Sequence, residues 1–210
     1  MAAMAEVALV TGGARRIGRA IVEKLARAGY AVAIHHGDSR ADAEALLQEL
    51  EASGAKACLV TADLVDPQAV ATLIPAVEAA LGPVTLLVNN AASFVADDVR
   101  SLDIATWNRQ FSINLRAPSQ LIGIMAERLP ADAKGAVVNI VDQRVWKLTP
   151  QYYSYTLTKA ALLTATRTLA QALAPRIRVN AVGPGPTFPN SYDGADRLEQ
   201  EVAGTLLGHR

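Results

Sequence analysis

Short apolar runs alternate along the chain with longer segments in which apolar residues return every three or four positions. The short runs are typical of strands buried on both faces, and the longer segments are typical of amphipathic helices. Strands are predicted over residues 7–10, 31–34, 57–60, 86–89, 136–141 and 178–182. Helices are predicted over residues 17–28, 41–53, 67–81, 106–128 and 153–174, and Pro118 should kink or break the fourth.

This order of elements predicts an α/β fold: a doubly wound parallel sheet with Rossmann-like topology and helices on both faces. No repeat, linker or low-complexity segment interrupts the pattern, so residues 1–210 should form a single domain. Residues 189–209 are polar at first and then helical in pattern. We expect them to form a lid over a substrate.

Composition narrows the choice of partners. The chain has 210 residues, 51% of them hydrophobic, and its 20 basic side chains balance 20 acidic ones. This balance disfavours a nucleic-acid surface and an electrostatic membrane partner, and no apolar stretch approaches the ~18 residues that a membrane span needs. Cys58 is the single cysteine and lies in an apolar run, which fits a reducing cytoplasm without disulfides or a metal site. The expected partners are a small-molecule substrate and copies of the chain itself.

A glycine-rich turn, Thr11-Gly12-Gly13-Ala14-Arg15-Arg16-Ile17-Gly18, directly follows the first predicted strand. Such a turn aims backbone N–H groups and the positive end of a helix at an anion, and glycine lets phosphates approach the main chain. An ordinary strand-to-helix connection is the alternative when the motif stands alone. Arg16 is unusual, because the commonest versions of this turn have a small residue there.

Polar residues also follow the other predicted strands, at the edge of the sheet where such folds bind ligands. They occupy positions 35–40, 63–64, 89–94 and 142–143. Each group alone is better explained as loop or helix-cap chemistry. Their common position favours one binding site.

Tyr155 and Lys159 lie four residues apart on a predicted helix and therefore on one face of it. A nearby ammonium group favours a phenolate, so Lys159 should lower the pKa of Tyr155 from its reference value near 10 and suit it for general acid–base catalysis. A surface Tyr–Lys pair is the alternative. Tyr152 and Tyr153 are rival candidates, but neither has a lysine at position i+4.

These motifs resemble the short-chain dehydrogenase/reductase family in order and spacing over essentially the whole chain. The residues that carry the resemblance are Thr11-Gly12-Gly13 with Gly18, Asn89-Asn90-Ala91, Asn114, Tyr155 with Lys159, and Pro184-Gly185. The resemblance implies binding of NAD(H) or NADP(H) and hydride transfer. Tyr155 would donate or accept the proton, Lys159 would also hold the nicotinamide ribose, and Asn114 would support a proton-relay water. The implied cofactor contacts are Gly12, Arg16, Ile17, Gly18, Asp63 beside the adenine, Leu64, Asn89, Ala91, Lys159 and, near the nicotinamide, residues 183–187 with Pro184 and Gly185.

Asp142 departs from the usual pattern of that family, which has a serine thirteen residues before the tyrosine. An ionised carboxylate cannot donate a hydrogen bond to a carbonyl oxygen, so an ordinary ketone site would be impaired. Pteridine reductases, with the related dihydromonapterin and dihydrofolate reductases, resemble this chain in having an arginine in the glycine turn, an Asn-Asn-Ala-x-Ser-Phe stretch and an aspartate in place of the serine. Here those features are Arg16, residues 89–94 and Asp142.

A pterin is a flat, electron-poor ring with a polar rim, so an aromatic side chain can stack on it while polar groups hold its edge. Asp142 beside Tyr155 could pass a proton to a ring nitrogen, with pKa values raised by repulsion and burial. The expected substrate contacts are Arg16, Ser93, Phe94, Asp142 and Tyr155. In the alternatives, Phe94 packs on the domain, Arg16 binds only phosphate, and Asp142 caps a turn.

The cofactor prediction favours NADP(H), and NAD(H) is possible. His36 stands at the tip of the second strand, where an acidic residue would bind the ribose diol of NAD. Arg16, Ser39 and Arg40 offer the charge and hydroxyl that a 2′-phosphate needs. Asp38 opposes this preference, because a carboxylate repels a phosphate.

The leading hypothesis is an NADPH-dependent reductase of a dihydropterin or a related C=N heterocycle, a homotetramer by family resemblance. One alternative is a general carbonyl or 3-oxoacyl thioester reductase of the same family, in which Asp142 is protonated. Another is a catalytically weak NADP-binding sensor or scaffold. Members of the family usually continue with another helix and a last strand, whereas this chain stops at Arg210. We therefore expect that strand to be absent from this chain.

Overall fold

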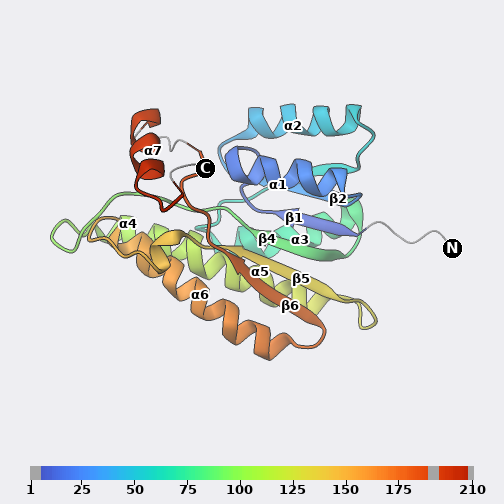
Figure 1. The fold of residues 1–210 in the computed structure, drawn as a ribbon. Coiled ribbons are helices and arrows are strands. Elements are labelled where there is room, and N and C mark those ends of the chain that lie inside the picture. The colour runs from blue at the N-terminus through green and yellow to red at the C-terminus, as the bar shows by residue number, and fades with distance from the viewer. Residues whose placement is uncertain (1–5, 189–193, 208–210) are drawn as a thin grey trace.

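Six parallel strands form one sheet in the order β3-β2-β1-β4-β5-β6 (Figure 1). The structure, a computed structural model, describes residues 6–188 and 194–207. The strands are β1 (Val7–Val10), β2 (Ala31–His36), β3 (Ala57–Thr61), β4 (Val84–Asn89), β5 (Gly135–Ile140) and β6 (Ile177–Val182). The predicted Rossmann-like, doubly wound sheet is confirmed. The chain reverses its direction across the sheet between β3 and β4, which places a ligand-binding crevice beside the end of β1.

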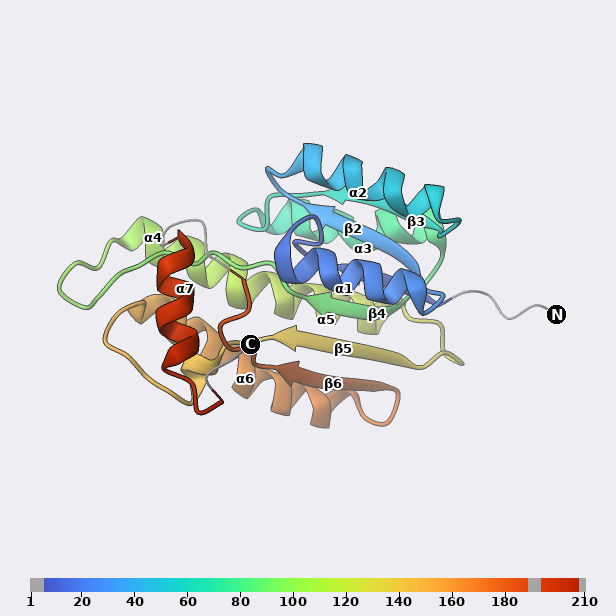
Figure 2. The same cartoon turned by 45° about the horizontal axis from the view of Figure 1, so that its top comes forward.

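Helices cover both faces of the sheet (Figures 1 and 2). One face carries α1 (Arg16–Arg27) and α2 (Arg40–Ala52), and the other carries α3 (Pro67–Leu81), α5 (Ala117–Arg128) and α6 (Tyr153–Leu173). The start of α3 shows how the sequence sets these boundaries. Asp66 accepts a hydrogen bond from the N–H of Gln68 at 2.8 Å, and Pro67 occupies the first helical position, where no N–H is needed.

Side chains that alternate along the strands supply a separate core to each face. In β2, Val32 and Ile34 pack with Leu46 of α2, and all three are 0% exposed. Ala31 and Ala33 belong to the other core, which includes residues of α3 and α5. Because the strands are apolar on both faces, the polar side chains of the motifs collect at the strand ends, on a rigid platform.

The predicted helix over residues 106–128 is divided into three parts. α4 (Ile104–Phe111) is followed by a π-helical turn (Ser112–Arg116) and then by α5. Pro118 lies in the first turn of α5, so the break comes just before it, as predicted. Proline has no N–H and therefore cannot donate to the carbonyl of Asn114, four residues back, so the regular ladder of α-helical hydrogen bonds is interrupted at this point.

α7 (Gly194–Ala203) lies beyond the carboxyl ends of the strands, apart from the helices that cover the sheet (Figure 2). The helical part of the predicted lid is therefore at the ligand-binding edge. Residues 189–193 and 208–209 of that prediction lie outside the described residues. Within residues 6–188 and 194–207, β6 is the last strand along the chain. In the same ranges, none of the helices has the length and apolar character required to cross a membrane.

Candidate active site

The loop after β4 holds the glycine turn in place. Asn90 Nδ2 donates to the main-chain carbonyls of Thr11 at 2.8 Å and Gly12 at 3.0 Å. In return, Thr11 Oγ1 accepts from the N–H groups of Asn90 at 3.0 Å and Ala91 at 3.1 Å. These four bonds fix the main chain from which α1 starts.

Close approach of the main chain to itself explains the residue types in the turn. Gly12 has a φ of 61°, and a Cβ on Gly18 would lie only 2.0 Å from the carbonyl oxygen of Gly12. Arg16 has a φ of 51°, in the left-handed region that glycine adopts without strain. This position accounts for the small residue in the commoner versions of the turn. Arg16 Nη2 donates to the carbonyl of Phe188 at 3.2 Å.

His35 supports the same turn from β2. Its Nδ1 accepts from the N–H of Gly12 at 3.1 Å, and its Nε2 lies 3.2 Å from the carbonyl of Ala62. The two contacts together require a neutral ring with its proton on Nε2. Burial lowers the pKa of His35 from 6.5 to about 4. From the sequence, His35 stood out only as a polar residue at a strand end, and this role was missed.

Acidification should destabilise the protein through His35. The unfolded chain binds a proton here near pH 6.5 and the folded chain only near pH 4, so the stabilisation is complete above pH 6.5 and is lost as the pH falls toward 4. From pH 7 to pH 5, the free energy of unfolding should fall by about 2 kcal/mol more in the wild type than in His35→Asn. Urea unfolding at both pH values measures the difference. An undiminished pH dependence in His35→Asn would contradict the assignment.

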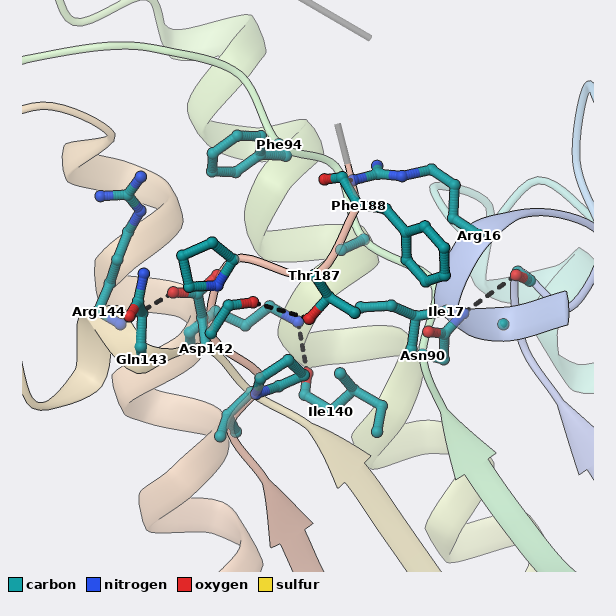
Figure 3. Close-up of a pocket in the computed structure, with 18 of the residues that line it drawn as sticks. Arg16, Ile17, Asn90, Phe94, Ile140, Asp142, Gln143, Arg144, Thr187 and Phe188 are labelled. Atoms are coloured by element: carbon teal, nitrogen blue, oxygen red, sulfur yellow. Dashed lines mark hydrogen bonds between the residues drawn. The ribbon is translucent and has the colours of Figure 1, made fainter. Parts of the chain in front are cut away.

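A cavity of about 380 Å³ opens between the glycine turn and the carboxyl ends of the central strands (Figure 3). This volume suits part of a small ligand. The structure thus brings together residues that are far apart in the sequence. The predicted site residues that line the cavity are Gly12, Arg16, Ile17, Gly18, Ala91, Phe94, Asp142, Tyr155, Lys159, Pro184 and Gly185.

Tyr155 and Asp142 are directly paired in this cavity. The Tyr155 hydroxyl donates to Asp142 Oδ2 at 3.0 Å. Asp142 Oδ1 accepts from the N–H of Arg144 at 2.8 Å and thereby caps a short 3-10 helix (Gln143–Val145). Asp142 therefore caps a turn, as the alternative interpretation held, and also contacts Tyr155.

The pKa of Tyr155 is raised well above its ordinary value of 10, first by burial and then by the charge and hydrogen bond of Asp142. The prediction that Lys159 lowers this pKa is wrong. The carboxylate of Asp142 touches the phenol, whereas Lys159 Nζ is 5.7 Å from the centre of the ring. Tyr155 is therefore a neutral phenol at neutral pH, which can give up a proton to a strongly basic group formed beside it.

Lys159 is buried at the base of the cavity, with 2% of its surface exposed. Its Nζ donates to the carbonyl of Ile140 at 2.7 Å. Burial lowers the pKa of Lys159 from 10.5 to about 8, and Asp142 acts in the opposite direction. The ammonium group predominates at neutral pH and has three N–H donors, so donors remain for a ligand in the cavity.

Aromatic rings form one side of the cavity. Phe94 stacks on Tyr152 with ring centroids 4.3 Å apart and an angle of 4° between the planes. The edge of Tyr155 packs against Phe94 at 4.6 Å and 77°. Phe94 lines the cavity, as the substrate-contact prediction requires, and it is also packed against the domain, as the alternative held.

Asn89 does not line the cavity, contrary to the sequence prediction. It is 2% exposed, and its Nδ2 donates to Asn139 Oδ1 on β5 at 2.9 Å. The last residue of a strand that is buried on both faces points its side chain into the protein. The next residue, Asn90, lines the cavity instead.

Ser93 and Asn114 lie behind the cavity wall and not in it. The Asn114 amide accepts from the N–H of Ser93 at 2.8 Å and donates to its carbonyl at 2.9 Å. Asn114 is 0% exposed and also donates to Thr158 Oγ1 on α6 at 3.1 Å. Ser93 is not among the lining residues, and its contact with a substrate stays a prediction. Asn114 ties the loop that carries Phe94 to the helix that carries Tyr155.

The remaining predicted cofactor residues follow β2 and β3, outside this cavity but at the same edge of the sheet. They are His36, Ser39, Arg40, Asp63 and Leu64. Arg40 Nε bonds Glu44 Oε1 at 2.7 Å on the surface of α2, and Asp63 Oδ1 accepts from the N–H of Val65 at 2.9 Å. Leu64 is 6% exposed and packs in the core. Contacts of this group with a cofactor stay predictions.

Several lining residues were not predicted to contact a ligand. They include Arg15, Ile140, Arg144 and Phe188. Arg144 Nη2 lies 3.6 Å from Glu201 Oε1 on α7. Arg144 follows Asp142 by two positions and Glu201 lies in the predicted lid, but no spacing in the sequence indicates that the two meet.

Comparisons with known proteins agree with this geometry. The sequence profile of the short chain dehydrogenases matches residues 6–195. The 3-oxoacyl-[acyl-carrier-protein] reductase FabG of Staphylococcus aureus is 31% identical over 201 residues, which cover 95% of this chain and 82% of that protein.

Two solved structures extend the comparison. FolM alternative dihydrofolate reductase 1 from Brucella canis, complexed with NADP, is 50% identical and has a TM-score of 0.95 over 98% of this chain and 82% of that one. A blue fluorescent protein from a metagenomic library, in complex with NADPH, is 38% identical with a TM-score of 0.89 over 97% of this chain and 84% of that one. The chain belongs to the short-chain dehydrogenase/reductase family of NAD(P)-dependent oxidoreductases.

Proposed function

We propose that the protein is an NADPH-dependent reductase that reduces a ring C=N bond of a pteridine. The observation that carries the proposal is the Tyr155–Asp142 pair, 3.0 Å apart beside Phe94 in the cavity. A flat ring against Phe94 would have the phenol and the carboxylate at its edge. The 50% identity to a structure described as an alternative dihydrofolate reductase supports this substrate class.

The residues present fit a dinucleotide cofactor. The N-terminus of α1 faces the cavity through Arg16, Ile17 and Gly18, so backbone N–H groups and the helix dipole can hold a pyrophosphate. Lys159 has donors to spare for a ribose hydroxyl. When bound, the reduced nicotinamide supplies the hydride.

NADPH is favoured over NADH. The residue at the end of β2 is His36 and not an acid, and the solved relatives were crystallised with NADP or NADPH. Arg15 pairs with Asp42 at 2.5 Å on the surface and Arg40 pairs with Glu44. Such exposed ion pairs contribute little to stability, so either guanidinium can turn toward a 2′-phosphate.

Tyr155 is the proposed proton donor. Its hydroxyl is protonated at neutral pH and is oriented by Asp142 Oδ2. As hydride reaches the ring carbon, the neighbouring ring nitrogen becomes basic and takes the proton from the phenol. The guanidinium groups of Arg144 and Arg16 favour the phenolate electrostatically and stabilise it once the proton has left. Asp142 holds the phenol in position through Oδ2, and Phe94 excludes water from one side.

The proposal also includes a lid over the cavity and a homotetrameric assembly. α7 acts as a lid, since Leu198 and Glu201 on it line the cavity. The lid as we propose it spans residues 189–209, of which 194–207 are described. The homotetramer expected from the family resemblance stays part of the proposal.

A carbonyl or 3-oxoacyl thioester reductase is the second candidate, favoured by the 31% identity to FabG of Staphylococcus aureus. The two candidates differ at Asp142. A carbonyl oxygen needs a hydrogen-bond donor, which a serine hydroxyl supplies and an ionised aspartate does not.

Asp142→Ser should therefore move activity from pterins toward carbonyls. We expect kcat for 7,8-dihydrobiopterin to fall by at least about tenfold, because the carboxylate that orients the Tyr155 hydroxyl is lost, while reduction of a 3-oxoacyl thioester or a small diketone rises. NADPH and NADH oxidation with each substrate, in wild type and variant, is the measurement. Asp66→Ser, which alters a similar helix cap remote from the cavity, is the matched control and should leave the substrate ratio unchanged. Turnover of thioesters but not of pterins by the wild type would refute the proposed function.

A further inference from the structure

A second, larger cavity adjoins the first on its α7 side. It has a volume of about 900 Å³, and polar side chains such as Gln143, Arg144 and Lys147 are among its lining residues. The two cavities share the lining residues Gln143, Arg144, Gly185, Pro186, Thr187 and Glu201. We call the first the inner cavity and the second the outer cavity. A molecule longer than one ring system can therefore occupy both.

Arg144 stands at the boundary between the inner and outer cavities and is held rigidly. Its side chain is only 12% exposed, and its Cζ lies 4.7 Å from the centre of the Tyr152 ring. Its Nη1 lies 3.5 Å from Thr149 Oγ1, and its main-chain N–H bonds Asp142. In Figure 3 its side chain lies across the inner cavity from Arg16. A guanidinium fixed by stacking loses little further freedom when it binds a ligand.

The acidic partner of Arg144 is Glu201, and the distance between the two charged groups is long. Glu201 Oε1 on α7 is 3.6 Å from Arg144 Nη2, well beyond the ~2.7–2.9 Å of a direct charge-assisted hydrogen bond. A guanidinium has five N–H donors in a planar fork that fits two carboxylate oxygens. Among the described residues that line the outer cavity, Glu201 is the one acidic side chain, and exposed Lys147 adds a second positive charge.

We propose that Arg144 binds a carboxylate on the tail of the substrate, and that Glu201 occupies the place of this carboxylate until the substrate arrives. The inference rests on the proposed function, because it places the reducible ring in the inner cavity beside Phe94 and the acidic tail in the outer cavity. Arg144 is then the residue that determines specificity for substrates with acidic tails. Binding of the tail also releases Glu201, and with it one contact of α7.

The test compares 7,8-dihydrofolate, which carries a glutamate tail, with 6-hydroxymethyl-7,8-dihydropterin, which has the same ring and no acid. In Arg144→Gln, the ratio of kcat/KM for dihydrofolate to kcat/KM for the hydroxymethyl compound should fall by about tenfold, mainly through KM. In Glu201→Gln, the same ratio should rise by about twofold or more, because the competing carboxylate is gone. Opposite changes in the two variants are not expected from damage to the fold.

A matched ion pair far from the cavities provides the control. Arg128 Nη2 and Glu78 Oε2 are 2.6 Å apart between α5 and α3, so Arg128→Gln and Glu78→Gln should leave the ratio at its wild-type value. Equal losses for both substrates in Arg144→Gln would overturn the inference and make Arg144 a structural residue. Calorimetric binding of folic acid to the NADP-loaded enzyme separates the two proposals. Arg144-dependent binding without turnover of any pterin would refute the proposed function alone, and binding unaffected by Arg144→Gln would refute the tail site.

Discussion

Tyr155→Phe should lower kcat for pterin reduction by about 10³-fold, since general acid catalysis by a positioned side chain contributes roughly 10²–10⁴-fold. The substitution removes the hydroxyl that donates to Asp142 at 3.0 Å and leaves the ring, its contact with Phe94 and the surrounding core in place. The loss should therefore appear in kcat, while NADPH still binds. Single-turnover oxidation of NADPH measures the chemical step, and quenching of protein fluorescence follows cofactor binding.

Tyr153→Phe is the control for this prediction. Tyr153 lies on the same helix two residues earlier, packs near Trp107 and does not line the cavity. The structure thereby selects Tyr155 among the three neighbouring tyrosines. If Tyr153→Phe lost as much activity as Tyr155→Phe, or if Tyr155→Phe kept its kcat, the assignment of the proton donor would fail.

Gly18→Ala should have the second large effect, on the fold and on cofactor binding together. The added Cβ would lie 2.0 Å from the Gly12 carbonyl oxygen and 2.6 Å from Asn90 Nδ2, so the turn and the loop after β4 would have to separate. We expect the free energy of unfolding to fall by about 3 kcal/mol, at the upper end for overpacking, and NADPH affinity to fall with it. Urea unfolding and titration with NADPH measure the two effects.

Gly123→Ala is the matched control for the glycine prediction. Gly123 is exposed on α5, and a Cβ there would meet nothing within 4 Å. Alanine is the better helix former, so this variant should gain about 0.5–1 kcal/mol. Unchanged stability and NADPH affinity in Gly18→Ala would show that the glycine turn is not built as described.

The fold could be predicted from the sequence because its signals are local. Apolar runs of strand length and glycines after helices mark the elements, and Pro118 marks the break before α5. The pairing of Tyr155 with Asp142 could also be anticipated, since both follow from a known spacing. For the Tyr155 pKa the sequence indicates two opposite shifts, a lowering by Lys159 and a rise from burial beside Asp142. The structure decides for the rise, because the outcome depends on which charged group touches the phenol.

Other features of the site depend on how distant segments pack. Asn90, and not Asn89, faces the cavity because of the side to which the chain turns as it leaves β4. His35 supports Gly12 only because β1 and β2 are neighbours in register. Arg144 lies near Glu201 only because of the way α7 packs against the 3-10 helix after β5. No sequence pattern indicates this packing.

Asp142 has two roles, one in the backbone structure and one in the chemistry of the site, and the two roles require different properties of the side chain. Its Oδ1 caps the 3-10 helix, a task that aspartate, asparagine, serine and threonine all perform, while its Oδ2 accepts the hydrogen bond from Tyr155 and, in the proposed function, selects the substrate edge. An exchange between serine and aspartate at this position therefore keeps the backbone intact and changes only the chemistry. If the proposed function holds, one substitution that the fold tolerates separates pterin reduction from carbonyl reduction at this position.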